Sequence, residues 1–167
     1  VEVGNTDAEG RLILADCLTA AAEDEPDLLV DLATLTGAQR VALGEDVPAF
    51  FTSNQELMNE LMDHSRHVQD PAWPLPLYFP YKSKLKSKIA DINNIATQGG
   101  GFGGAITAAL FLSEFVPKLN QWVHFDFNAW NEVDSPGKPQ GGEAMALRML
   151  VSFIQTKFRV QGIQQGS

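Results

Sequence analysis

The stretch Leu28-Leu-Val-Asp-Leu32, followed at once by Ala33-Thr-Leu-Thr-Gly-Ala38, decides the fold of this chain. A short, mostly apolar run is typical of a buried strand, and the glycine with its two threonines predicts a turn where that strand ends. In α/β proteins, ligands bind at the carboxyl ends of strands. The segment therefore predicts both a buried strand and a candidate binding loop.

Helical and strand-like segments alternate on both sides of this strand. Apolar residues at helical spacing predict an amphipathic helix over 11–22, and short apolar runs predict further strands. The remaining predicted segments are strands over 47–52 and 122–127, helices over 54–67, 105–116 and 142–158, and a proline-rich connection over 70–80. Strands that alternate with helices predict an α/β fold of three layers, helix-sheet-helix, with a mostly parallel, mixed central sheet.

Composition narrows the classes of protein and partner. At 167 residues with 44% hydrophobic content, the chain is expected to form one cooperative core. A net charge of -9 and a pI near 4.7 argue against nucleic-acid or anionic-membrane partners, because both would repel the chain. The most apolar stretch, 105–116, is far shorter than the ~20 residues of a membrane-spanning helix. A single cysteine, Cys17, excludes an intrachain disulfide and fits a reducing cytoplasm.

Residues Gly4 to Arg11 crowd two carboxylates and a guanidinium into one turn. If this backbone is extended, Asp7 and Glu9 project to the same side, so both could reach one pair of hard cations, with Arg11 facing the same cavity. The same residues also fit a helix capping box, in which Thr6 and Glu9 bind the first free amides of the next helix. Spacing alone favours the capping box, so the choice depends on a wider match.

The octapeptide Asn5-Thr-Asp-Ala-Glu-Gly-Arg-Leu12 resembles the signature of the leucyl aminopeptidase family, dinuclear metallo-exopeptidases also called cytosol aminopeptidases. The resemblance continues in the same order and covers nearly all of the chain. It includes Ile13-Leu-Ala-Asp16, Ala33-Thr-Leu-Thr-Gly-Ala38, Ala90-Asp-Ile-Asn-Asn94 and 105–116. Because the chain opens without an initiator methionine, we expect a piece of a longer protein: the C-terminal part of that catalytic domain over 1–159, with a frayed tail over 160–167.

The resemblance implies a site with two divalent ions (manganese, zinc or magnesium) and a bicarbonate ion as general base. Asp7 and Glu9 match two metal ligands, and Arg11 matches the catalytic arginine beside the attacking water. Such an ion pair lowers the pKa of the water and polarises the scissile carbonyl. In the family, a lysine and two aspartates complete the ligand set, and a second lysine lies near the water, all before the octapeptide. The site is therefore expected to be incomplete here and to bind metal weakly.

The resemblance assigns Thr34, Leu35 and Gly37 to a substrate loop, in which backbone groups of the leucine and glycine contact the peptide and the threonine lines the side-chain pocket. Glycine there lets the substrate approach closely. The implied activity is release of N-terminal, leucine-like residues from peptides by a cytoplasmic enzyme that is typically a hexamer. This chain alone is expected to be inactive. The alternative interpretation is a catalytically silent piece that keeps the fold and the subunit contacts.

A dinucleotide-binding oxidoreductase is a further alternative, because Gly99-Gly-Gly-Phe-Gly-Gly104 satisfies the pattern G-x-G-x-x-G. The preceding residues, 91–98, are too polar for the buried strand that such a site needs, so a flexible loop is the preferred interpretation. Cys17 is expected to be a buried thiol because its neighbours are small and apolar. His124, inside an apolar strand, is expected to be a satisfied core histidine.

Overall fold

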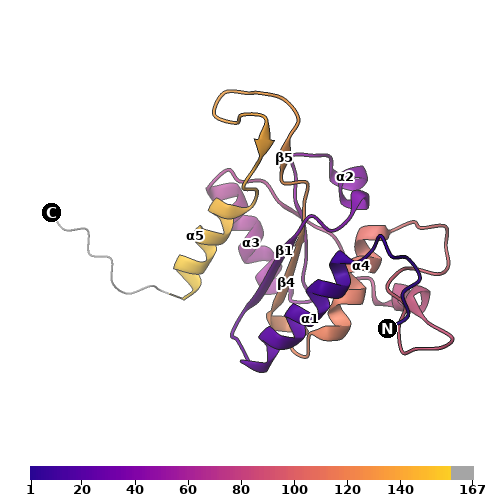
Figure 1. Cartoon of the computed structure of the whole chain (residues 1–167). Coiled ribbons are helices and arrows are strands. Elements are labelled where there is room, and N and C mark those ends of the chain that lie inside the picture. Colours follow the sequence, from indigo (N-terminus) through magenta and orange to yellow (C-terminus); the bar gives the residue numbers. More distant parts are fainter. Residues whose placement is uncertain (159–167) are drawn as a thin grey trace.

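The structure is a computed structural model that describes residues 1–158, so the tail expected over 160–167 lies outside the described residues. Helices cover both faces of a central sheet, which gives three layers (Figure 1). Figure 1 shows α1 (Gly10–Glu23) and α4 (Gly104–Leu112) on one face of the sheet, and α3 (Gln55–His67) and α5 (Leu147–Lys157) on the other. The predicted helix-sheet-helix fold is confirmed.

The central sheet has the strand order β1-β4-β2-β3. Its strands are β1 (Leu29–Ala33), β2 (Ala49–Phe51), β3 (Trp73–Pro74) and β4 (Trp122–Asp126). β1 runs parallel to β4, β2 runs parallel to β3, and β2 runs antiparallel to β4. The mostly parallel, mixed sheet is therefore confirmed. β1 is an edge strand, and its outer edge pairs with no strand of the described part of the chain.

β4 lies inside the sheet and is buried along its whole length. Its side chains belong to two separate cores because successive residues of a strand point to opposite faces. Val123 and Phe125 pack into the core under α3 and α5, whereas Trp122 packs into the core under α1 and α4. Full burial of one such large side chain stabilises the fold by about 1.5–3 kcal/mol. The sheet is therefore held firmly between two apolar layers.

A buried polar cluster joins β1 to β4. The Asp31 carboxylate accepts a hydrogen bond from Nε1 of Trp122 at 2.7 Å and lies 2.5 Å from Nδ1 of His124. The His124 ring is fully buried and stacks against both Trp122 and Phe51. Its Nε2 has no hydrogen-bond partner among residues 1–158. His124 is thus a core residue as predicted, but only one of its two ring nitrogens is bonded.

Several short elements were not predicted, and β3 and α2 are two of them. β3 lies inside the predicted proline-rich connection, where Trp73 donates its N–H to the carbonyl oxygen of Pro48. Two residues are too few to show a periodic pattern, and Pro74 has no N–H, so it fits only at a sheet edge. A further helix, α2 (Gly37–Leu43), continues the segment that was predicted only as a turn.

The closing helix begins later than predicted. The prediction was wrong over its first residues, because β6 (Gly141–Gly142) pairs with β5 (Trp130–Asn131) in an antiparallel ribbon. The next turn ends at Ala146, which has a left-handed φ of 61°, and α5 starts at Leu147. Glycine disfavours a helix interior by about 1 kcal/mol relative to alanine, so paired glycines weaken the helical continuation here.

The prediction that Cys17 is buried was wrong: the thiol is exposed. α1 turns Ala15 and Leu18 toward the core, and Cys17 lies on another face of the same helix.

The glycine-rich segment is a loop, in which four glycines have a left-handed φ. The element before it is the 3-10 helix η1 (Phe79–Leu85), so the strand that a dinucleotide site needs is missing. Among residues 1–158, no helix has both the length and the apolar character to cross a membrane.

Candidate functional site

The turn before α1 presents two free carboxylates. Its backbone is closed by Asn5, whose side-chain oxygen accepts from the N–H of Asp7 at 2.9 Å. The N-cap of α1 is Glu9 and not Thr6, and no side chain caps the helix. The capping-box interpretation is therefore wrong. The side chains of Asp7 and Glu9 are exposed and bond to no group in residues 1–158, which leaves both carboxylates available to a ligand.

A buried asparagine, Asn94, holds this turn in place. Its Oδ1 accepts from the N–H of Gly4 at 2.9 Å and of Asn5 at 3.3 Å. Its Nδ2 donates to the carbonyl oxygens of Asn5 at 2.8 Å and of Ala8 at 3.3 Å. Asn94 belongs to a segment that carried the family resemblance, but sequence reasoning gave it no role. The residue thus positions the backbone that carries Asp7.

Arg11 lies on the first turn of α1 and is partly buried. Its Nη1 donates to the carbonyl oxygen of Asn94 at 2.8 Å. Burial lowers the pKa of the guanidinium, and the Asp126 carboxylate opposes this shift by raising it. Because a guanidinium is not deprotonated in proteins, Arg11 brings a fixed positive charge to the turn that carries the two free carboxylates.

The predicted substrate loop follows β1 and is bound by the last residue of β4. Oδ1 of Asp126 accepts from the N–H of Leu35 at 2.9 Å and from that of Thr36 at 3.0 Å. Oδ2 accepts from the Thr36 hydroxyl at 2.6 Å. The Thr36 hydroxyl oxygen also caps α2 by accepting from the N–H of Gln39 at 3.2 Å. Asp126 is a second residue that sequence reasoning missed, since only its partners show its role.

The octapeptide turn and the substrate loop lie next to each other. A β-carbon built at Gly10 would lie 3.8 Å from Cδ1 of Leu35. Asp126 binds the loop and acts electrostatically on Arg11. Both segments therefore meet at the carboxyl ends of β1 and β4, where the fold predicts a ligand. The structure brings the predicted catalytic arginine and the predicted loop together.

Gly37 is not required by the conformation of the chain. Its φ lies outside the left-handed region that favours glycine. A β-carbon there would meet only the tip of Arg40, at 3.7 Å from Nη2. Gly104 is the opposite case, because its β-carbon would lie 2.9 Å from that of Ala38, so the contact between α2 and α4 needs a glycine. Open space over Gly37 fits the close approach of a ligand.

The residues present supply only part of a metal site. Asp7 and Glu9 offer carboxylate oxygens, the donors that hard divalent ions prefer. Within residues 1–158, however, no group of three or more histidine, cysteine, aspartate or glutamate side chains is arranged to hold an ion. Two carboxylates leave most positions of a divalent ion to water or to groups outside these residues. The described residues therefore do not form a complete centre.

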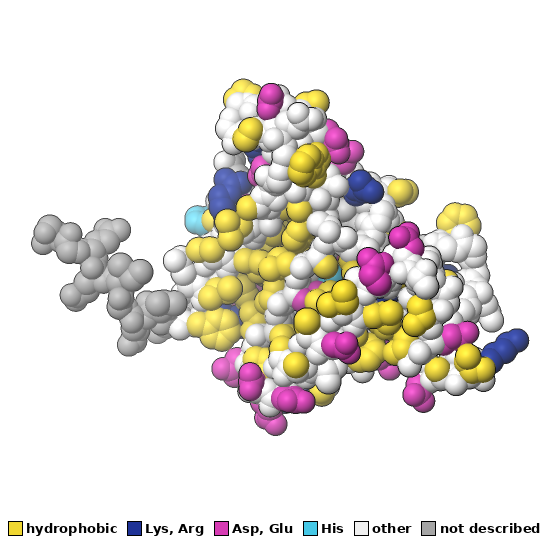
Figure 2. All heavy atoms as spheres, viewed as in Figure 1, with side chains coloured by type: hydrophobic (Ala, Val, Ile, Leu, Met, Phe, Trp, Pro, Cys, Tyr) yellow, Lys and Arg dark blue, Asp and Glu magenta, His cyan; other side chains and the backbone are white. Residues whose placement is uncertain are grey.

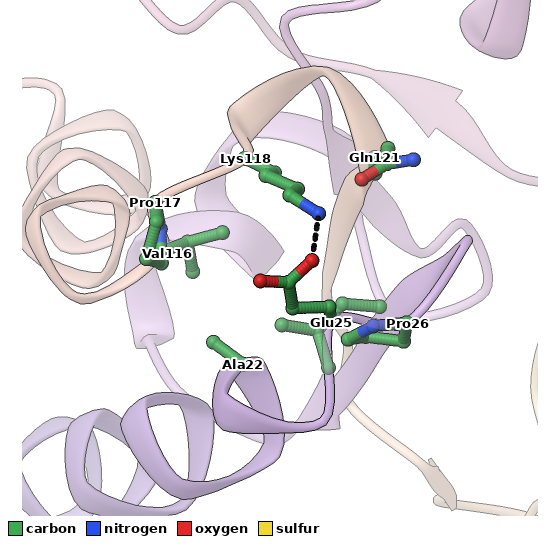
Figure 3. Close-up of a pocket in the computed structure, with 8 residues that line it drawn as sticks. Ala22, Glu25, Pro26, Val116, Pro117, Lys118 and Gln121 are labelled. Atoms are coloured by element: carbon green, nitrogen blue, oxygen red, sulfur yellow. Dashed lines mark hydrogen bonds and ion pairs between the residues drawn. The ribbon is translucent and has the colours of Figure 1, made fainter.

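An apolar hollow of about 140 Å³ lies elsewhere in the molecule (Figure 3). Leu29 at the start of β1 and Gln121 just before β4 line it, and an ion pair between Lys118 and Glu25, 3.1 Å long, spans part of it. The hollow therefore lies at the amino ends of the strands that carry the candidate site at their carboxyl ends. It belongs to a different part of the surface.

Comparison with known proteins identifies the family. The family described as cytosol aminopeptidase family, catalytic domain, matches residues 1–151. This chain belongs to the cytosol aminopeptidase family. The turn with Asp7 and Glu9 and the loop with Leu35 both lie inside the matched region.

Individual relatives agree with this assignment. A probable cytosol aminopeptidase of Prochlorococcus marinus (strain MIT 9215) is 45% identical over 159 residues, which are 94% of this chain and 32% of that protein. The cytosol aminopeptidase of Buchnera aphidicola subsp. Acyrthosiphon pisum (strain APS) is 46% identical over 156 residues, 92% of this chain and 30% of that protein. The chain thus spans about a third of the length of these curated relatives.

A solved structure shows the same fold. The crystal structure of the cytosol aminopeptidase from Coxiella burnetii is similar to this chain with a TM-score of 0.90 and 49% sequence identity. The match covers 95% of this chain and 34% of the crystallised one. The arrangement of helices and strands described above is therefore the arrangement of part of a cytosol aminopeptidase.

Proposed function

We propose that residues 1–159 act as the C-terminal part of the catalytic domain of a metal-dependent aminopeptidase, which releases N-terminal, leucine-like residues from peptides. The observation that carries the proposal is that two segments lie next to each other at the carboxyl ends of β1 and β4. One holds two carboxylates that no described group uses, and the other is a loop whose glycine the fold does not require. Because the chain belongs to the cytosol aminopeptidase family, we interpret the first segment as a source of metal ligands and the second as the peptide-binding loop.

Asp7 and Glu9 would supply two ligands of a pair of divalent ions, manganese, zinc or magnesium. When bound, such a pair supplies Lewis acidity and an activated water. Arg11 is held beside these ligands by Asn94, and its fork of N–H donors suits a bicarbonate ion or a developing oxyanion. The remaining ligands and a second catalytic lysine would come from residues outside this chain. The metal site that residues 1–158 contribute would accordingly be incomplete.

The loop of Thr34, Leu35 and Gly37 would bind the peptide. Asp126 engages the N–H groups of Leu35 and Thr36, while the N–H of Gly37 is bonded to no described acceptor. Thr34 is exposed beside the loop, where its side chain would line the pocket for the leucine-like side chain. The partners would be peptides, with no nucleic acid and no membrane, and the enzyme would be a cytoplasmic hexamer.

A second candidate is a catalytically silent piece that keeps the fold and its subunit contacts. Figure 2 shows hydrophobic side chains gathered on the face between α5 and α1, over the edge strand β1. Exposed apolar residues occur on all three elements, including Leu32, Val151 and Ile13. Such a surface favours contact with further protein. Under this candidate the chain would assemble but would not turn over substrate.

Two hydrolysis assays test the proposal. The 167-residue chain alone, with manganese or zinc and bicarbonate, is expected to release no more product from a leucyl amide than its Asp7→Ala variant. A chimera in which this chain replaces the matching part of the Coxiella burnetii enzyme is expected to be active, because identity is 49% over 95% of the chain. Activity of the chimera should disappear with Asp7→Ala.

The outcomes separate the two candidates. An inactive but folded and assembled chimera would reject the aminopeptidase role and favour the silent piece. Metal-dependent turnover by the 167-residue chain alone, lost in Asp7→Ala, would show that the missing ligands lie within these residues. Turnover that survives Asp7→Ala in the chimera would remove that residue from the site.

A further inference from the structure

Asp126 is a fully buried carboxylate at the end of β4. A buried charge is tolerated only when it is paired and hydrogen-bonded. Both oxygens of Asp126 are used, by the N–H groups of Leu35 and Thr36 and by the Thr36 hydroxyl, at 2.6 to 3.0 Å. All three partners belong to the loop after β1, which lies about 90 residues earlier in the chain. The loop therefore takes its conformation from a residue on another strand.

This binding divides the backbone groups of the loop into two sets. The N–H groups of Leu35 and Thr36 point to Asp126 and are not available to a ligand. The carbonyl oxygen of Leu35 and the N–H of Gly37 have no hydrogen-bond partner in residues 1–158. One acceptor and one donor of the loop thus remain without a described partner, and an extended peptide backbone requires such a pair.

We propose that Asp126 is the positioning residue of the substrate loop: its carboxylate turns the N–H groups of Leu35 and Thr36 inward and thereby leaves the Leu35 carbonyl and the Gly37 N–H for the peptide. The inference rests on the proposed function, which makes this loop the peptide-binding segment. It adds a residue that touches no substrate but determines how the substrate-binding backbone is presented.

The chemistry favours a carboxylate at this position. An ionised carboxylate only accepts hydrogen bonds, so it satisfies three donors at once. An asparagine would keep one oxygen acceptor but turn an NH₂ group toward the loop, where only the Thr36 hydroxyl can reorient to accept it. The same negative charge lies near Arg11, whose positive charge is otherwise disfavoured by burial. Asp126 thus supports both halves of the site.

Nuclear magnetic resonance of the ¹⁵N-labelled 167-residue chain tests the proposal. Amide hydrogen exchange is expected to be slow at Leu35 and Thr36 and fast at Gly37. In Asp126→Ala, exchange at Leu35 and Thr36 should accelerate about 10- to 100-fold, because each loses a hydrogen bond to a charged group. Exchange at Val30, inside β1, should stay unchanged.

The conservative variant separates positioning from general support of the fold. In Asp126→Asn, slow exchange at Leu35 and Thr36 should be restored, while both amide protons shift upfield because the acceptor is no longer charged. Titration with leucinamide should shift the Gly37 amide in the natural chain and in Asp126→Asn, but not in Asp126→Ala. Thr36→Val removes the hydroxyl that donates to Asp126 and caps α2, but it leaves both N–H donors in place. It is the matched control and should keep the amides of Leu35 and Thr36 protected.

Each outcome decides between two claims. Unchanged exchange at the loop in Asp126→Ala, or equal acceleration at Val30, overturns the positioning role. If Asp126→Ala does not fold, unchanged amide shifts in Asp126→Asn overturn it instead. Loop amides that respond as expected while leucinamide leaves Gly37 unaffected in the natural chain would reject peptide binding at this loop and keep the positioning role. Binding of leucinamide at Gly37 in Asp126→Ala would reject the positioning role and keep peptide binding at this loop.

Discussion

Arg11 donates a hydrogen bond from Nη1 to the backbone carbonyl oxygen of Asn94 at 2.8 Å, and the side chain of Asn94 bonds the turn that precedes Arg11. One residue therefore fixes both the candidate catalytic guanidinium and the backbone of Asp7. The two contacts use different atoms of Asn94, the backbone oxygen and the side-chain amide. A substitution at this position removes the second contact and keeps the first.

Asn94→Ala should loosen the octapeptide turn. The buried backbone groups that lose their partners are expected to reduce the free energy of unfolding by about 1–3 kcal/mol. Urea denaturation measures this loss, and faster amide exchange at Gly4 and Asn5, whose N–H groups lose their acceptor, locates it. Asn59→Ala, an exposed position on α3, is the control and should change stability by less than about 0.5 kcal/mol. Equal losses in both variants would contradict a special role for Asn94.

Gly37→Ala should keep the fold and impair the site. Alanine is accommodated at this position, so the free energy of unfolding should be unchanged or increase by up to about 1 kcal/mol. Binding of leucinamide, followed by amide shifts, should weaken because the methyl group occupies the open space. Gly104→Ala should behave oppositely and lose about 1–3 kcal/mol, since its methyl would overlap Ala38. A destabilised Gly37→Ala would show that this glycine is structural.

Asp31→Leu should destabilise the junction of β1 and β4. It leaves Nε1 of Trp122 and Nδ1 of His124 without their acceptor, at about 1–3 kcal/mol for each unpaired group. The double variant Asp31→Leu/His124→Phe removes the second unpaired group and should recover part of this loss. Denaturation midpoints of the two single variants and the double variant give the coupling energy. Additive losses would mean that the two side chains do not interact.

Metal binding by the 167-residue chain should be weak. Among residues 1–158, only Asp7 and Glu9 bring free carboxylates to the candidate site, and tight binding of hard ions needs several protein oxygens. Calorimetry with manganese is expected to show no submicromolar affinity. A tight site that disappears in Asp7→Ala would mean that the chain supplies more ligands than the structure brings together.

Arg11→Lys should impair the active chimera without unfolding it. Lysine keeps the charge but cannot offer the planar fork of donors that suits bicarbonate or an oxyanion. We expect kcat to fall by about 10²- to 10³-fold, the cost of losing one preorganised donor to an oxyanion. Initial rates with a leucyl amide measure this effect, and circular dichroism checks the fold. Full activity would exclude a forked contact.

Sequence patterns predicted the elements that are long or strongly capped. Asn54 was predicted to open a helix, and it caps α3 by accepting from the N–H groups of Glu56 and Leu57. The helix predicted over 105–116 was too long at its end. α4 ends at Leu112, a short 3-10 helix follows over Ser113–Phe115, and Val116 leaves the helical region because it precedes a proline. Local sequence patterns therefore predicted the helices and strands that form the three layers, but not every residue at which a helix begins or ends.

The sequence predicts candidate ligands for the site, but it did not indicate the residues that position them. Asp7, Glu9 and Arg11 came from a contiguous motif, whereas Asn94 and Asp126 act on segments 83 to 91 residues away. Nothing in the spacing of a sequence reveals such pairings, because they exist only after the strands have assembled. The exposed Cys17 shows the converse failure: small apolar neighbours did not show which helix face the core covers.

The free edge of β1 has a practical consequence for experiments on the isolated chain. Its outward N–H and C=O groups are unpaired within residues 1–158, and Leu32 on this strand is 50% exposed. An open, apolar strand edge is a template on which a second strand can add. The isolated chain should consequently self-associate as its concentration rises, and the lines of its nuclear magnetic resonance spectrum should then broaden. Dilution series should precede any binding titration, so that oligomerisation is not mistaken for ligand affinity.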